Sequence, residues 1–91
     1  MAKLLTEKEV VEQLKKVPRW GRHGAEISRL YTFSGFVAAM AFVNHVADLA
    51  ETMDHHPDIL IQYKKVKLTL STHSVGGLSD LDFTLAQKID A

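Results

Sequence analysis

The sequence predicts an α+β fold of order α-β-β-α-β-β-α, with a four-stranded antiparallel sheet and helices packed on one face. Three observations support this prediction: helix-start motifs near both ends, a long apolar segment in the middle, and a pair of strand-like segments on each side of it. The chain has 91 residues, 46% of them hydrophobic and 24% charged, and we expect residues 1–91 to form a single domain.

The first helix is predicted to begin at a capping box, Thr6-Glu7-Lys8-Glu9. There the Thr6 hydroxyl and the Glu9 carboxylate can satisfy free amides of the first turn. Apolar residues then recur at helical spacing: Val10, Leu14 and Val17. Pro18 is expected to end the helix. Residues 20–33 follow as a β-hairpin, with Gly21 and Gly24 in its connection.

A long helix is predicted over residues 35–53, with Ser34 as its cap. One apolar stripe is expected to face the core: Phe36, Ala39, Met40, Val43, Ala47 and Ala50. A second stripe lies on another face: Ala38, Ala41, Phe42 and Leu49. A helix that is apolar nearly all round has to be buried nearly all round. We therefore expect the second stripe to face another copy of the chain, in a dimer or tetramer formed through the 35–53 helix.

A second hairpin is predicted from strands at 59–63 and 66–73. The later strand alternates apolar and polar residues, which places His73 on its polar face near the end. Gly76-Gly77 should break this strand, and Ser79-Asp80-Leu81-Asp82 forms a second capping box that opens the last helix. Three residues of that helix should face the core: Leu85, Ala86 and Ile89.

Composition excludes several classes of function. Eleven basic residues balance eleven acidic ones, so the chain lacks the basic face that nucleic-acid binding requires. It has no cysteine for disulfide or thiolate chemistry. Neither a secretory signal nor an apolar run long enough to span a membrane is visible, and we expect a cytoplasmic location.

The histidines carry the functional signal. His55-His56-Pro57 stands at the end of the long apolar segment, and His73 follows at a distance. Histidine exchanges its proton near neutral pH, so such a cluster predicts proton transfer. Pro57 should end the helix near His55. Adjacent side chains there diverge, so His55 and His56 are expected to line two parts of one small-molecule pocket, with His73 at the same opening.

Other interpretations of these residues stay open on spacing alone. The paired histidines could simply be a polar helix end, in which imidazoles assist the last carbonyls. Adjacent histidines fit zinc poorly, because helical zinc ligands usually lie four residues apart, so no metal site is predicted. Glu51, one turn before His55, can orient an imidazole or belong to a solvated stripe. Asp82 fits a helix cap, Asp54 a helix end, and Trp20 either the core or a flat wall for an aromatic ligand.

The combined pattern resembles the pterin-4a-carbinolamine dehydratase family. The resemblance rests on Glu51-x-x-x-His55-His56-Pro57 with Tyr63, His73 and Asp82 at the family's spacing. It also rests on Leu70-Ser71-Thr72-His73 and Gly77-Leu78-Ser79, and it covers the chain from Trp20 to the last helix.

The resemblance implies an enzyme without metal or organic cofactor that removes water from a 4a-hydroxytetrahydropterin and gives the quinonoid dihydropterin. By similarity, His55 and His73 would be the acid and base, and His56 would bind and orient the pterin. Four further residues match positions that line the family's pterin site: Asp54, Ser71, Thr72 and Ser74. Glu51 would support the histidines, and Asp82 would help to hold the site together.

The family also implies a homotetramer with the long helices between subunits, and animal members act as dimerisation cofactors of a homeodomain transcription factor. This chain has Val75 where those members have cysteine and Leu81 where they have arginine. These differences make a coactivator role less expected here. A non-catalytic oligomeric binding or scaffold module is the alternative to the enzyme.

Overall fold

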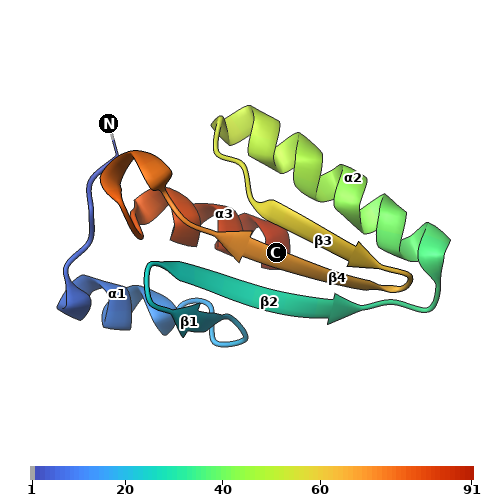
Figure 1. Ribbon diagram of the computed structural model, residues 1–91, viewed down its shortest axis with the longest axis horizontal. Helices are drawn as coiled ribbons and strands as arrows, with labels where there is room; N and C mark the ends of the chain where they lie inside the picture. Colours follow the sequence, from blue (N-terminus) through green and yellow to red (C-terminus); the bar gives the residue numbers. More distant parts are fainter. Residues whose placement is uncertain (1) are drawn as a thin grey trace.

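The computed structural model describes residues 2–91, and it confirms the predicted order of elements (Figure 1). The helices are α1 (Glu7–Leu14), α2 (Phe36–Met53) and α3 (Asp80–Asp90). The strands are β1 (Gly21–His23), β2 (Glu26–Thr32), β3 (Asp58–Gln62) and β4 (Lys65–Leu70). A short 3-10 helix, η1 (His73–Val75), separates β4 from α3.

The two hairpins join into one antiparallel sheet of order β1-β2-β4-β3. The join is the pairing of β2 with β4, in which Ile27 lies opposite Leu70 and Thr32 opposite Lys65. In Figure 1, α3 runs behind the sheet and α2 runs along its β3 side. The sheet therefore has one face covered by helices and one open face, as predicted.

Strand alternation sets which side chains enter the core. Along β4, Val66, Leu68 and Leu70 are buried, whereas Lys65 and Lys67 are exposed on the open face. The core also takes residues from every helix and from the segments between them: Val10, Val17, Trp20, Ile27, Ala39, Val46, Ala50, Leu78, Phe83, Leu85, Ala86 and Ile89. The three inner residues predicted for the last helix are thus confirmed.

The face of α2 that enters the core matches the predicted one only in part: Ala39 and Ala50 are buried as expected, and Val43 packs against the core. Phe36 and Ala47 are exposed, although they were expected inside. Phe42, expected to face another copy, is instead partly buried against the core, with its ring centroid 4.5 Å from that of Tyr31 and 4.9 Å from that of Phe33. Because the helix is apolar nearly all round, its periodicity could not select one face. Packing against the sheet determined which side chains are buried.

Several predicted boundaries were also wrong. The first helix ends at Leu14, before Pro18, and a tight turn carries the chain onward. Gly35, not Ser34, precedes α2, and it provides no side-chain cap. Gly21 lies in β1, so only Gly24, with a φ of +58°, serves the turn of the first hairpin. Within residues 2–91, no helix has both the length and the apolar character that a membrane crossing requires.

Candidate active site

A sharp turn at the end of α2 positions the two adjacent histidines. Asp54 follows the helix in the left-handed conformation, with a φ of +51°. Its amide donates to the carbonyls of Ala50 and Glu51, and the amide of His55 donates to Ala50 at 3.1 Å. Aspartate tolerates this conformation better than most side chains, and such a residue commonly ends a helix. The chain then turns so that His55 and His56 diverge, as predicted.

His55 points inward, toward the start of α3. Only 8% of the residue is exposed, and its Nε2 lies 2.6 Å from Oδ1 of Asp82. Asp82 is completely buried. A carboxylate in this position selects one ring tautomer and one ring orientation. The pair joins the end of α2 to the beginning of α3, two elements separated by the whole second hairpin.

The second carboxylate oxygen of Asp82 holds the start of α3. Oδ2 accepts a hydrogen bond from the Thr72 hydroxyl at 2.8 Å and another from the Ser79 amide at 2.9 Å. The Ser79 hydroxyl accepts from the amide of Leu81, which completes the predicted capping box. Asp82 is therefore both a helix cap and the partner of a buried histidine.

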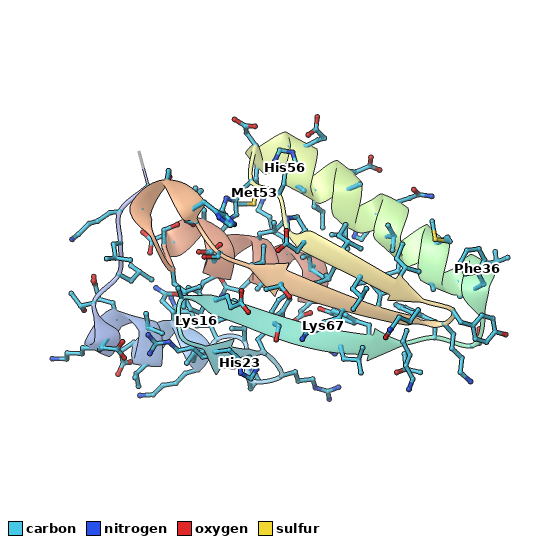
Figure 2. The ribbon with its side chains drawn as sticks, in the orientation of Figure 1. Lys16, His23, Phe36, Met53, His56 and Lys67 are labelled. Atoms are coloured by element: carbon cyan, nitrogen blue, oxygen red, sulfur yellow. The ribbon has the colours of Figure 1, made fainter. Side chains whose placement is uncertain are left out.

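His56 points outward and pairs with Glu51. Its Nε2 lies 2.5 Å from Oε2 of Glu51, and both side chains are exposed. Figure 2 shows His56 at the C-terminal end of α2, beside Met53. Glu51 thus contacts an imidazole, one of the two roles expected for it, and the imidazole is that of His56 because the turn at Asp54 carries His55 inward.

A cavity of about 330 Å³ lies on the open face of the sheet. Its lining comes from the first hairpin, the segment after α2, the end of β4 and η1: Ala25, Glu26, His56, Asp58, Thr69, Ser71, His73 and Gly76. Imidazoles from two distant stretches thus border one pocket, of a volume that suits a small ligand. Two such groups can give a proton at one ligand atom and remove one at another.

His73 reaches this pocket by a different route from the one predicted. β4 ends at Leu70, and His73 is the first residue of η1 rather than part of a strand. Thr72 forms an isolated bridge with Gly77, and the residues between them form a tight loop. That loop presents the exposed His73 side chain at the edge of the cavity.

The remaining predicted pterin contacts divide into two groups. Ser71 lines the cavity and donates from its hydroxyl to the carbonyl of Ala25 at 2.7 Å. Thr72 turns inward to Asp82 and is only 5% exposed. Asp54 lines a different cavity, next to Ser79 and Asp80. His55, Pro57 and Ser74 are also absent from the lining of the pocket that contains His56 and His73.

Trp20 lies away from this cluster. It is buried, and its indole N–H donates to the carboxylate of Asp90 at 2.8 Å. The same carboxylate accepts from Arg29 and Tyr31, and burial raises the pKa of the Tyr31 hydroxyl far above its usual range. Asp90 ends α3, about 12 Å along the helix from Asp82 at 1.5 Å per residue. Trp20 therefore anchors the far end of α3 and does not wall the cavity.

The structure adds residues that the sequence analysis missed. Glu26, Asp58 and Thr69 line the cavity, and Ser79 joins the buried polar group around Asp82. Strand alternation would have found Thr69, since it shares the polar face with Ser71. Glu26 could not have been found, because it reaches the pocket only through the pairing of β2 with β4. In the described part of the chain, no three His, Cys, Asp or Glu side chains are arranged to hold a metal ion.

Fold and site together define an α+β protein with a histidine-lined pocket on the open face of its sheet. Residues 3–91 match the model of the family described as "Pterin 4 alpha carbinolamine dehydratase", and the chain belongs to that family.

Relatives of known name support the same assignment. The chain is 53% identical over 87 residues to a protein of Acidobacterium capsulatum named "Putative pterin-4-alpha-carbinolamine dehydratase", an alignment covering 96% of this chain and 95% of that one. A similarly named protein of Sulfurisphaera tokodaii is 47% identical over 88 residues, covering 97% and 95% of the two chains.

Two solved structures share the fold. One is the "transcriptional coactivator/pterin dehydratase from Brucella Melitensis", with a TM-score of 0.92, 36% identity, and coverage of 97% of this chain and 96% of that one. The other is "a pterin dehydratase-like protein as a RuBisCO assembly factor in the alpha-carboxysome". It has a TM-score of 0.64 at 22% identity, covering 79% and 83% of the chains, and it shows the fold alone.

Proposed function

We propose that this chain is a catalytic pterin-4a-carbinolamine dehydratase, which removes water from a 4a-hydroxytetrahydropterin to give the quinonoid dihydropterin. One observation carries the proposal: His56 and His73, from segments that are distant in sequence, border the same cavity. His55, the residue before His56, is held in one orientation by Asp82. Membership of the family supports the substrate class.

The chemistry requires two proton transfers. Loss of the hydroxyl from C4a needs a proton on the departing oxygen, and a ring N–H has to lose one, so the product and water balance the substrate. We assign His55 and His73 to these two transfers and His56 to binding and orienting the ring. Asp82 supports the assignment, since it fixes the orientation of His55. Each well-placed acid or base contributes about 10²–10⁴-fold in rate.

Stopped-flow absorbance of the 4a-hydroxypterin intermediate tests this proposal. The protein should accelerate the decay of the intermediate, and His73→Ala and His55→Ala should each remove about 10²-fold of that acceleration. His45→Ala is the matched control, because His45 is an exposed imidazole on the surface of α2. An unchanged rate in both site variants would remove the mechanism. No acceleration by the parent protein would favour the non-catalytic binding or scaffold module.

We also propose that the chain forms a homo-oligomer through the outer face of α2. Val37 supports this, since it is an apolar side chain with 84% exposure on that helix. Val37→Asp should reduce the sedimentation coefficient and leave the fold intact. Phe42→Asp should instead lower the free energy of unfolding, because Phe42 is partly buried and packs against the core. A parent protein that sediments as a monomer would contradict the proposal.

We further propose that residues 1–91 act as one domain in the cytoplasm. There the proposed product would serve pterin recycling after aromatic amino acid hydroxylation. Product identification by absorbance during coupled turnover with a hydroxylase checks the recycling role. A hydroxylase whose steady-state rate is unaffected by the protein would argue against it.

A further inference from the structure

Two buried hydroxyl groups lie behind Asp82, and the proposed mechanism gives neither of them a task. The Thr72 hydroxyl lies 2.8 Å from Oδ2 of Asp82 and 2.7 Å from the Ser79 hydroxyl. Ser79 is completely buried, like Asp82, and Thr72 is nearly so. With His55, these side chains form one continuous polar group inside the protein.

Counting donors and acceptors fixes the direction of every bond in this group. An ionised carboxylate can only accept, so the single hydrogen of the Thr72 hydroxyl goes to Asp82. The contact between the two hydroxyls must then use the hydrogen of Ser79, whose oxygen accepts from the amide of Leu81. On the other side of the carboxylate, a neutral His55 has to donate from Nε2.

This arrangement leaves Nδ1 of His55 as the nitrogen without a proton. Within residues 2–91, no buried side-chain nitrogen or oxygen lacks a hydrogen-bond partner, and the hydrogen bond of the His55 side chain uses Nε2. Nδ1 therefore belongs to the small part of the ring that reaches the surface. A proton acceptor at that edge is what a general base requires.

We propose that Thr72 and Ser79 are positioning residues: Ser79 orients the Thr72 hydroxyl, Thr72 holds the Asp82 carboxylate, and Asp82 keeps His55 in the Nε2–H form with Nδ1 ready to accept a proton. The proposal rests on the proposed function for its catalytic consequence. It changes the role of Thr72, from a residue in contact with the pterin to one that acts through Asp82.

Three variants separate positioning from general stability. Thr72→Val removes the donor to Asp82 but keeps the shape of the side chain, and Thr72→Ser restores the hydroxyl. Ser79→Ala removes the hydroxyl that donates to Thr72. Thr6→Ala is the matched control, because Thr6 caps α1 in a capping box like that of Ser79 but is exposed. Nitrogen NMR of the imidazole rings, with His55→Ala to assign the signal, reports the tautomer. Stopped-flow turnover reports kcat and KM.

We expect Thr72→Val to increase the Nδ1–H form of His55 and to lower kcat about 10-fold with little change in KM, as for other residues that orient a reacting group. Thr72→Ser should restore both readouts. Ser79→Ala should act in the same direction but less strongly. Because Ser79 acts through Thr72, the double variant should match Thr72→Val alone. Thr6→Ala should lower the melting temperature without moving tautomer or kcat.

Two results would overturn the proposal: an unchanged His55 tautomer in Thr72→Val, or a double variant whose loss of kcat is the product of the single losses. If Ser79→Ala does not fold, Thr72→Val and Thr72→Ser carry the same test, since both leave the cap of α3 in place. If the parent protein has no dehydratase activity, the proposed function fails, and the NMR readout alone decides for or against the positioning role.

Discussion

The two ends of the molecule carry the same local motif in different surroundings. At α1, Thr6 and Glu9 form a capping box in which the Thr6 amide donates to the carboxylate at 2.9 Å; Thr6 is exposed and Glu9 is partly exposed. At α3, Ser79 and Asp82 form the same box completely buried, with the amide at 2.9 Å from the carboxylate. The motif starts a helix in both places, since it satisfies free amides of the first turn.

Burial is what separates the two boxes. The carboxylate of Asp82 is surrounded by protein, so each of its oxygens needs a donor from the protein. His55 provides one for Oδ1, and Thr72 and the Ser79 amide provide two for Oδ2. The carboxylate of Glu9 has water available. A capping residue therefore acquires a second role only where the fold closes over it, and the following predictions test this difference.

The largest difference is expected in activity. Asp82→Asn keeps the shape of the side chain but places an amide where His55 and Thr72 both donate, so one of these bonds is lost or reversed. We expect a loss of kcat of about 10²-fold or more, by analogy with other carboxylates that hold a catalytic imidazole. Glu9→Gln, the same chemical change in the exposed box, should leave stopped-flow turnover unchanged. Equal effects in the two variants would show that burial is irrelevant.

A smaller difference is expected in stability. Asp82→Ala leaves three buried donors without an acceptor, from His55, Thr72 and the Ser79 amide, which should cost about 3 kcal/mol of unfolding free energy. Glu9→Ala should cost clearly less, because water replaces its partner. Urea unfolding followed by circular dichroism gives both values. A similar midpoint for the two variants would contradict the prediction.

The contribution of the capping box at α1 to stability should depend on pH in the acid range. Hydrogen bonds from the Thr6 amide and hydroxyl lower the pKa of Glu9 below its ordinary value of 4.5. Its contribution to stability is therefore fully present above pH 4.5 and is lost as the pH falls through the lowered pKa of the folded state. Melting temperatures measured from neutral to acid pH should fall more steeply for the parent than for Glu9→Gln. Parallel curves would exclude this contribution.

The smallest effect is expected where α1 meets β1. The Arg22 guanidinium donates two hydrogen bonds to Glu7, at 2.6 and 2.7 Å, and lowers the pKa of that carboxyl. The glutamate is exposed, so water screens the pair. Arg22→Ala should destabilise the protein only slightly in low salt, and high salt should remove the difference. A large loss that persists in high salt would mean that Arg22 acts through packing.

Much of the fold followed from local patterns. The capping boxes marked where α1 and α3 begin, and the alternation of β4 placed its lysines on the open face. The core face of α2 followed only in part, because a helix with apolar residues on every side has no single preferred stripe until a sheet packs against it. Of the predicted pterin contacts, only His56, Ser71 and His73 line the cavity. Glu51 orients one of the imidazoles, that of His56, and Trp20 is a core residue, the first of the two roles that the sequence left open.

The amino-acid sequence by itself determined the element order and the family, and it singled out His55, His56 and His73 as candidate site residues. It could do so because capping, alternation and spacing are local properties of the chain. Tertiary structure alone decided which imidazole turns inward. The left-handed turn at Asp54 directs His55 to a buried carboxylate and His56 to the surface. The first turn of α3 carries that carboxylate, so the packing of α3 beside the end of α2 gives the two neighbours different chemistry.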